Sequence, residues 1–406
     1  MSALACAKTD SLAVSSIASL PVAERNAAQG FNDTIDRLAD DFVEVYLSIT
    51  EPGDYLYTTL GHAAYHLKCP TFGLDYYFTM EGENTPDAVF RFLKGNLKMG
   101  LAAIPAKEYL SPYVHDNRGV TEYKINLSPL QKQTFWALLD EYTHKWENLP
   151  YDYFHHSCAI SLMELMYKLG GRDEICYAEP WEEKFHHTAG DLVYFRLRET
   201  HPWVLSFIRL LAGNEVDEKR PNDQKLMIPA DLLEVWQKAT LRARPLLDSE
   251  PIEILPKGDR GKVWFTPTMA SILLLVAAVV SLFIVRTDKH WLIVCGKIVD
   301  STIWGLVTLL GLFLTYLLFF SNLPCTDWNW LYIAFNPLPA ICWFWRKYWA
   351  LPYAICMIIW TIAMMCMPYM AAYSEHIILT IAWVIVLFKQ YYVEYLRKQK
   401  YKKDEN

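Results

Sequence analysis

Cys158 is the residue whose surroundings are most typical of a nucleophile. The segment Tyr151-Asp-Tyr-Phe-His-His-Ser-Cys158 precedes an apolar stretch, Ala159–Leu169, which predicts a helix that Gly170-Gly171 ends. Cys158 is then in the first turn of that helix, where peptide N–H groups and the helix dipole stabilise a thiolate and lower the thiol pKa. The pattern indicates a cysteine that attacks a carbonyl carbon.

A nucleophilic thiol needs a general base, and His62 is the leading candidate. It lies in Leu60-Gly-His-Ala-Ala-Tyr-His66, which we expect to be a strand. If Phe72–Met80 pairs beside this strand, Asp75 or Thr79 is placed to orient the imidazole, since residues four apart share a strand face. The prediction is a catalytic set of Cys158, His62 and Asp75, with Thr79 as the alternative third member and a ring nitrogen roughly 3–4 Å from the sulfur.

Two other readings of these residues stay open. A cysteine at a helix start is often a small buried residue. His62 and His66 face the same side of a strand and, with His155 or His156, make a conceivable zinc set, but no HExxH or CxxC spacing accompanies them. We therefore predict no metal and no cofactor.

The elements that must position these residues are of both kinds, so the expected class is α+β. Residues 42–49 and Phe72–Met80 read as strands. Asp87–Leu101 reads as an amphipathic helix. Ser128-Pro-x-Gln131 opens another helix, running to about Trp146, through a capping box with proline in the first turn.

Composition excludes some functions. The net charge of -7 gives no reason to expect nucleic acid. The nine cysteines include no CxxC pair, and the four outside the apolar C-terminal region do not make a disulfide framework.

The C-terminal third, from about Val263 to Val393, is expected to be an integral membrane domain. Two stretches are long enough without qualification, two are good candidates, and a fifth is short, broken by two prolines, and either a kinked span or a re-entrant segment. In chain order the five are Phe265–Val285, Ser301–Phe320, Leu331–Trp345 (the broken one), Trp349–Met367 and Ile377–Val393.

Loop charges set the expected orientation. Lysine and arginine follow the first, third and fifth spans, whereas the loops after the second and fourth have none. Basic loops stay cytoplasmic, so the N-terminal part lies outside. The predicted organisation is a poorly ordered segment 1–30, an extracytoplasmic catalytic domain 31–255, a membrane domain 263–396 and a basic cytoplasmic tail 397–406.

The chain resembles the Lnb-type lipoprotein N-acyltransferase family. The resemblance covers nearly all of the chain from about residue 42, and the order and spacing of its short motifs make it specific. These motifs are Thr50-Glu-Pro-Gly-Asp-Tyr-Leu-Tyr57, Leu60-Gly-His-Ala-Ala, Asp75-Tyr-Tyr-Phe, Phe92-Leu-Lys-Gly-Asn-Leu-Lys98, Asn126-Leu-Ser-Pro-Leu-Gln-Lys132, Tyr151-Asp-Tyr-Phe…Cys158, Pro202-Trp203…Leu210-Leu-Ala-Gly213, Leu226-Met-Ile-Pro229 and Asp327-Trp-Asn-Trp-Leu…Asn336-Pro337.

This resemblance implies a circularly permuted, papain-like cysteine-hydrolase domain followed by an all-α membrane bundle of about five helices. It implies a protein of the bacterial inner membrane with its catalytic domain on the periplasmic side. The implied reaction moves a fatty acyl chain from a diacylglyceryl lipoprotein to its N-terminal cysteine amine through an acyl-thioester. Cys158 is the implied nucleophile and His62 the implied base. The implied partners are lipoprotein or phospholipid substrates and membrane lipids.

Two alternatives remain beside acyl transfer. One is a cysteine hydrolase of the same fold, a peptidase, amidase or lipid hydrolase that uses water as acceptor. The other is a non-catalytic binder. The argument for the binder is that this chain reads His156-Ser157-Cys158 where the family usually reads Asp-Asn-Cys, and has Ser161 where the family has arginine.

The loop charges generate a first testable prediction. A protease added to intact spheroplasts should digest residues 31–255 and spare the lysine-rich tail, because the two are expected on opposite sides of the membrane. Protection of the soluble domain would refute this orientation.

Overall fold

The computed structural model describes residues 43–83, 85–177, 188–258, 261, 263–341, 346–367 and 373–404. The predicted N-terminal segment 1–30 lies outside them. The chain forms two compact units. The first comprises residues 1–88, 97–186 and 220–260, and the second comprises 89–96, 187–219 and 261–406.

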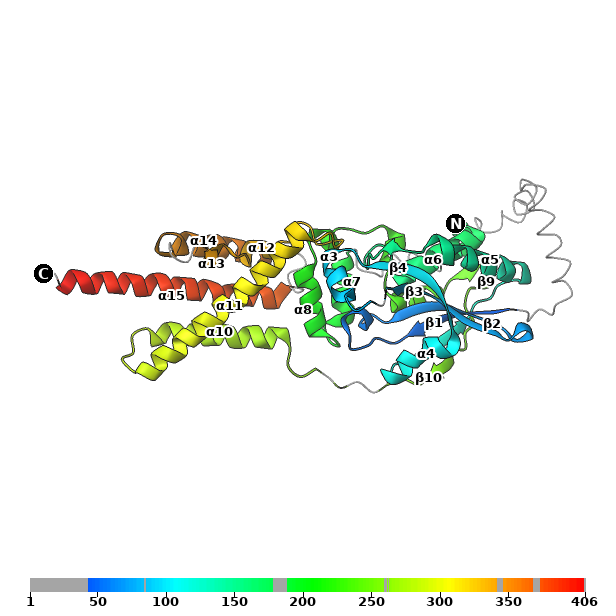
Figure 1. The fold of residues 1–406 in the computed structure, drawn as a ribbon, viewed down its shortest axis with the longest axis horizontal. Helices are drawn as coiled ribbons and strands as arrows, with labels where there is room; N and C mark the ends of the chain where they lie inside the picture. Colours follow the sequence, from blue (N-terminus) through cyan, green and yellow to red (C-terminus); the bar gives the residue numbers. More distant parts are fainter. Residues whose placement is uncertain are drawn as a thin grey trace. The chain divides into compact units, whose positions relative to one another are not determined.

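The first unit is built on a seven-stranded antiparallel sheet in the order β10-β5-β1-β2-β3-β4-β6 (Figure 1). Its strands are β1 (Glu44–Thr50), β2 (His62–Cys69), β3 (Leu74–Gly82), β4 (Lys98–Pro105), β5 (Val120–Lys124), β6 (Leu149–Pro150) and β10 (Ile252–Leu255). A small sheet joins β7 (Ile175–Cys176), β8 (Thr240–Leu241) and β9 (Arg244–Pro245). The predicted strands 42–49 and Phe72–Met80 are confirmed as β1 and β3, and each is shifted by one or two residues toward the C-terminus.

Helices cover both faces of the large sheet. The helices of this unit are α4 (Ala106–His115), α5 (Pro129–Lys145), α6 (Cys158–Gly170) and α9 (Pro229–Trp236). Apolar β2 residues such as Tyr65 and Leu67 join the core that contains α5, α6 and α9. The opposite face, with Ala64 and Tyr77, packs on α4. The predicted capping box of α5 is confirmed, with Ser128 and Gln131 bonding each other's backbone.

The predicted helix Asp87–Leu101 is wrong beyond its first half. The helix α3 spans only Ala88–Lys94, and from Lys98 the chain is strand β4. Gly95, at φ +75°, turns the chain between them. Pairing of β4 with β3 supplies the backbone hydrogen bonds that a longer helix would otherwise make.

The second unit contains two segments that precede the membrane helices in the chain. Residues 89–96 and 187–219, which include α7 (Ala189–Leu197) and α8 (Pro202–Leu211), belong to it. The loop after α11 holds α3 through backbone and side-chain bonds, from Asn322 N to Lys94 O (3.0 Å) and from Ser321 Oγ to Leu93 O (2.6 Å). Asp217 accepts hydrogen bonds from Arg209 (2.7 Å) and from Tyr373 (2.9 Å), which ties the α8 segment to α15.

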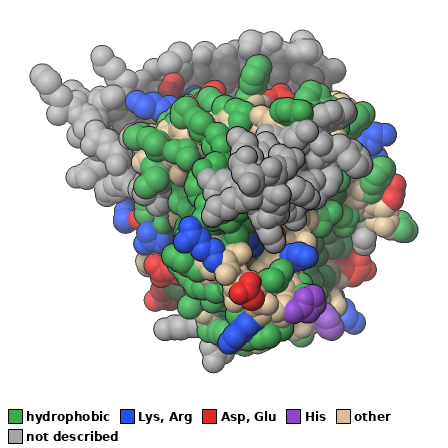
Figure 2. Space-filling view, turned by 90° about the vertical axis from the view of Figure 1, so that its left-hand side faces the viewer, with side chains coloured by type: hydrophobic (Ala, Val, Ile, Leu, Met, Phe, Trp, Pro, Cys, Tyr) green, Lys and Arg blue, Asp and Glu red, His purple; other side chains and the backbone are tan. Residues whose placement is uncertain are grey.

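Within the described residues, four helices are long and apolar enough to cross a membrane. They are α10 (Pro267–Ile284), α11 (His290–Phe320), α14 (Arg346–Met365) and α15 (Ser374–Asp404). The apolar spans within α14 and α15 are Tyr348–Met365 and Ser374–Leu396. Viewed from the left-hand side of Figure 1, much of the surface is hydrophobic, with lysine and arginine scattered among the apolar side chains (Figure 2).

The predicted third span, Leu331–Trp345, is not a single helix. Its described part forms two four-residue helices, α12 (Leu331–Ala334) and α13 (Leu338–Ile341), because Pro337 has no N–H to continue the helix. The Asn336 side chain satisfies the local backbone instead. Its amide nitrogen donates to Ile333 O (3.0 Å) and its oxygen accepts from Leu338 N (3.2 Å).

These short helices still carry the chain in the direction that a third span requires. Trp304 of α11 lies against Trp349, near the start of α14 (6.4 Å between ring centroids). Trp330, which follows the end of α11, accepts a hydrogen bond from Trp360, near the end of α14 (3.1 Å). The helices α11 and α14 therefore run in the same direction, and the segment between them, which contains α12 and α13, runs in the opposite direction.

A buried histidine network joins three strands of the large sheet. His66 of β2 bonds Glu122 of β5 through Nδ1 (2.6 Å) and Asp75 of β3 through Nε2 (2.5 Å). Tyr77 donates to the same Glu122 oxygen (2.5 Å) and stacks on His66 at 4.0 Å. His66 and Glu122 are both almost inaccessible to solvent.

This network generates a stability prediction. Glu122→Ala leaves the His66 and Tyr77 donors buried without their acceptor, so the free energy of unfolding should fall by about 3–5 kcal/mol. The matched control is Glu253→Ala, which removes an exposed glutamate from the neighbouring strand β10. Thermal unfolding of the detergent-solubilised chain measures both, and equal midpoints would contradict the prediction.

Candidate active site

The first turn of α6 presents Cys158, as predicted. Ser157 is the N-cap, and its hydroxyl accepts from Ile160 N (3.3 Å) and donates to Met227 O (2.7 Å). The serine that departs from the family's Asp-Asn-Cys pattern therefore caps the helix. Cys158 is a free thiol, half-buried at the helix start.

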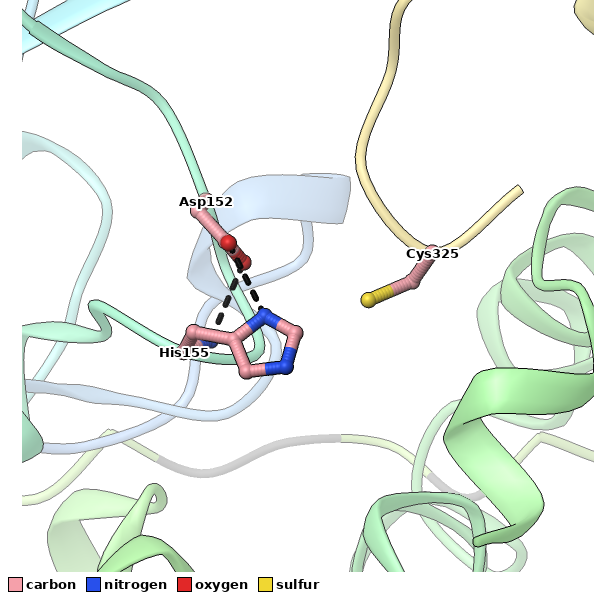
Figure 3. Close-up of side chains that lie close together, drawn as sticks. All are labelled: Asp152, His155 and Cys325. Carbon is pink, nitrogen blue, oxygen red and sulfur yellow. Dashed lines mark hydrogen bonds and ion pairs between the residues drawn. The ribbon is translucent and has the colours of Figure 1, made fainter. Parts of the chain in front are cut away.

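The loop before α6 is shaped by Asp152. Its carboxylate accepts from the backbone N–H groups of Phe154 (3.1 Å) and His155 (3.0 Å) and from the His155 ring (2.9 Å). Figure 3 shows the Asp152 carboxylate facing the His155 imidazole. Cys325, also drawn there, belongs to the other compact unit.

The structure brings Cys158 to the start of β2. The backbone N–H groups of Ala63, the residue after His62, and of Ala159 and Cys158 itself are near enough to the sulfur to lower the pKa of the thiol. The thiol thus lies near the residue that follows the predicted base, although 96 residues separate Cys158 from His62 (158 − 62). A direct contact between a His62 ring nitrogen and the sulfur stays a prediction.

Thr79, not Asp75, meets His62. The Nε2 atom of His62 lies 2.5 Å from Thr79 Oγ1, and the Thr79 hydroxyl donates to Glu81 Oε1 at 3.2 Å. The placement of Asp75 beside His62 is wrong, because Asp75 pairs across the strands with Lys68 and bonds His66. The two candidates share a face, but their register sets them beside different histidines.

The bonds of Thr79 favour one tautomer of His62. When the Thr79 hydroxyl donates to Glu81, its oxygen accepts a hydrogen bond from His62, and Nε2 carries the hydrogen. The lone pair of the neutral ring is then on Nδ1, the nitrogen required to accept a proton from a thiol. Thr79 accordingly acts as an orienting partner for the imidazole.

Glu81 is a site residue that the sequence reasoning missed. Its Oε1 lies 3.8 Å from His62 Nε2, and burial raises the pKa of its carboxyl. The signal was present in the alternation of β3, since Asp75, Thr79 and Glu81 are all at odd positions and share one face.

Burial governs the charges of the nucleophile and base. It raises the pKa of the Cys158 thiol to about 11, which outweighs the three backbone N–H groups that lower it. It also lowers the pKa of His62 to about 4, helped by the positive charge of Arg118. The expectation of a lowered thiol pKa is therefore wrong. The loss of water around the sulfur destabilises the thiolate by more than the N–H groups of the helix start stabilise it.

The alternative zinc set is not assembled. Thr79 engages His62 Nε2, two carboxylates engage both nitrogens of His66, and Asp152 engages His155 Nδ1. Among the described cysteines of the soluble part, Cys69 is free and buried in the core, whereas Cys176 is disulfide-bonded. The expectation of no disulfide framework therefore missed one bridge.

Comparison with known protein families gives two matches that together cover most of the chain. Residues 33–180 match the Lnb N-terminal periplasmic domain, and residues 259–400 match the Lnb transmembrane domain. The chain belongs to the Lnb family. It is thus a membrane protein with an extracytoplasmic N-terminal domain, and both Cys158 and His62 lie within the matched periplasmic domain of Lnb. A search of curated proteins and a search of solved structures each found no match.

The raised thiol pKa generates a prediction on reactivity. Alkylation of Cys158 by iodoacetamide, followed on its tryptic peptide by mass spectrometry, should be slow at pH 7 and rise with pH until about 11, because only the thiolate reacts. Glu81→Gln should move the inflection to lower pH, since the Glu81 charge raises the Cys158 pKa. Denatured chain, which titrates as an ordinary thiol, is the control. A native rate that already levels off near pH 7 would contradict the prediction.

Proposed function

We propose that this Lnb protein transfers a fatty acyl chain from a diacylglyceryl lipoprotein to the amine of its N-terminal cysteine, through an acyl-thioester on Cys158. The observation that supports the proposal is the capped helix start that places Cys158 near the N–H of Ala63, the residue that follows His62 on β2. This proposal includes three further points. The domain is papain-like and circularly permuted, it lies at the periplasmic face of a bacterial inner membrane, and its substrate is a lipoprotein.

The first half-reaction forms the thioester. The Cys158 proton passes to His62 Nδ1 as the sulfur attacks the ester carbonyl, since both groups are neutral at pH 7. The carbon–oxygen ester bond breaks, and His62 returns the proton to the departing glycerol oxygen. The acyl group is now bonded to Cys158.

The second half-reaction passes the acyl group to nitrogen. The amine of the lipoprotein's terminal cysteine attacks the thioester, and His62 accepts its proton. The carbon–sulfur bond breaks, an amide remains, and the proton returns to the Cys158 sulfur. In this proposal the N–H groups of Ala63 and Cys158, which lower the thiol pKa, stabilise the carbonyl oxygen as it gains negative charge.

Thr79 and Glu81 are positioning residues in this scheme. Thr79 holds His62 in the tautomer that leaves Nδ1 free for the thiol proton. Glu81 accepts a hydrogen bond from the Thr79 hydroxyl, so that this hydroxyl does not donate to the imidazole ring. The Glu81 charge, 3.8 Å from Nε2, also favours the imidazolium that forms during each step.

A hydrolase of the same fold is the second candidate, because the same pair would act on an ester or amide with water as the acceptor. The alternative of a non-catalytic binder rested on His156-Ser157 and on Ser161, and the capping role at the helix start concerns Ser157 alone. The structure gives Ser157 a capping role compatible with a functional helix start, so this departure no longer favours the binder.

Mutation tests the proposal. Cys158→Ser and His62→Ala should each abolish acyl transfer in purified chain, because a serine hydroxyl is a far weaker nucleophile than a thiol and because His62 is the proposed base. The double variant should be about as inactive as either single one. Mass spectrometry of the lipoprotein N-terminus measures transfer.

Two further variants separate positioning from catalysis. Thr79→Val should lower kcat while Thr79→Ser retains most activity, because serine keeps the hydroxyl. Cys295→Ser, at an exposed cysteine of α11, is the matched control and should be active. Full transfer by Cys158→Ser would exclude the thioester. Release of free fatty acid without N-acylation by wild type would favour the hydrolase.

A further inference from the structure

The loop between β1 and β2 displays a stacked pair of tyrosines. Tyr55 and Tyr57 are 56% and 71% exposed, with ring centroids 5.9 Å apart and ring planes within 7° of parallel. A tyrosine ring combines an apolar body with a polar tip, so two exposed rings side by side are suited to a boundary between apolar and aqueous phases. The catalytic scheme uses neither ring.

The turn that carries these rings is closed by its own hydrogen bonds. Gly53 N donates to Thr58 O (2.8 Å), Thr58 N donates to Tyr55 O (2.8 Å), and Tyr55 N donates to Thr58 Oγ1 (3.1 Å). A Cβ at Gly53 would lie 2.2 Å from Thr58 Oγ1, so the turn requires glycine there. The turn is thus ordered before any partner binds, so binding does not have to supply the conformational entropy lost in ordering its backbone.

The loop is also fixed to its surroundings at its first residue. Glu51 N donates to Gly119 O (2.9 Å), and Arg118 Nε donates to Glu51 O (2.8 Å). Lys257 Nζ forms an ion pair with the Glu51 carboxylate (2.7 Å). These bonds attach the start of the loop to segments at the end of the sheet where His62 lies.

Chain connectivity limits how far this loop can be from the bilayer. Lys257, which contacts Glu51, precedes Pro267, the first residue of α10, by only ten residues (267 − 257). Ten residues span at most about 35 Å even when fully extended. The headgroup layer that α10 enters is therefore joined to the residue that contacts Glu51 by a short connection.

We propose that the loop of residues 51–61 contacts the membrane, and that Tyr55 and Tyr57 insert into the headgroup layer of a phospholipid bilayer. Tyrosine is enriched at membrane interfaces, where its ring sits at headgroup depth. Because the loop ends at His62, the contact fixes the reactive end of the sheet at the level where an ester bond joins acyl chain to glycerol. This inference does not depend on acyl transfer, and any lipid-directed chemistry at Cys158 would benefit from it.

Photo-crosslinking in the full-length chain tests the contact. Benzoylphenylalanine replaces Tyr55 or Tyr57 in a Cys158→Ala background, and the chain is placed in nanodiscs of phosphatidylethanolamine and phosphatidylglycerol. The control position is Phe72, which is 61% exposed but follows the opposite end of β2. Mass spectrometry identifies the adducts after illumination. Since Cys158 is absent, the result is independent of any turnover.

We expect phospholipid adducts at positions 55 and 57 and none at position 72. Adducts of equal yield at all three positions would overturn the proposal, because they would show unspecific lipid contact. Adducts to the chain's own peptides in place of lipid would also overturn it, because the rings would then be covered by protein. Absence of any adduct at 55 and 57 would have the same consequence.

Discussion

The contact between the first turn of α6 and the first residues of β2 is the interaction on which the site depends. It brings a thiol to the N–H of Ala63, and the same strand carries His62 next to it. Two features hold the contact in place. Ser157 caps the helix and bonds Met227 O, and the Tyr65 hydroxyl donates to Leu162 O of α6 (2.6 Å). A helix that shifted along the sheet would lose both bonds.

Burial of that contact has a chemical consequence. A thiol and an imidazole that are removed from water are both held in their neutral forms, with pKa values of about 11 and about 4. A neutral pair reacts by moving the proton during attack, so its rate depends on the ring presenting the correct nitrogen. The Thr79–Glu81 arrangement of β3 serves that requirement, which makes the tautomer as important as the distance.

The membrane unit also contains a buried charge, and this charge is paired. Lys389 of α15 is buried among the helices, where it bonds Asp300 of α11 (2.7 Å) and the Ser281 hydroxyl of α10. Ser281 in turn donates to Asp300 (3.0 Å). A charge inside such a bundle is tolerated when it is paired and hydrogen-bonded, and these bonds join three helices. The extracytoplasmic end is joined in the same manner through Arg209, Asp217 and Tyr373.

Local signals in the sequence were sufficient for several elements. Ser128 and Gln131 predicted a capping box, and Gly170-Gly171 predicted the end of α6, because caps depend on residues within one turn of each other. Apolar runs predicted the four long membrane helices, since spanning depends on length and hydropathy alone. The placement of Cys158 at a helix start followed from the same local rules, and so did its proximity to a strand-borne histidine as a hypothesis.

Properties that depend on non-local contacts were outside the reach of these signals. Asp75 and Thr79 lie on one strand face, and only the register of β3 against β2 assigns one to His66 and the other to His62. The Asp87–Leu101 stretch has helical spacing throughout, yet pairing with β3 converts its second half into β4. The thiol pKa was predicted in the wrong direction because a helix start is visible in sequence, whereas the loss of water around the sulfur arises only when distant segments close over it.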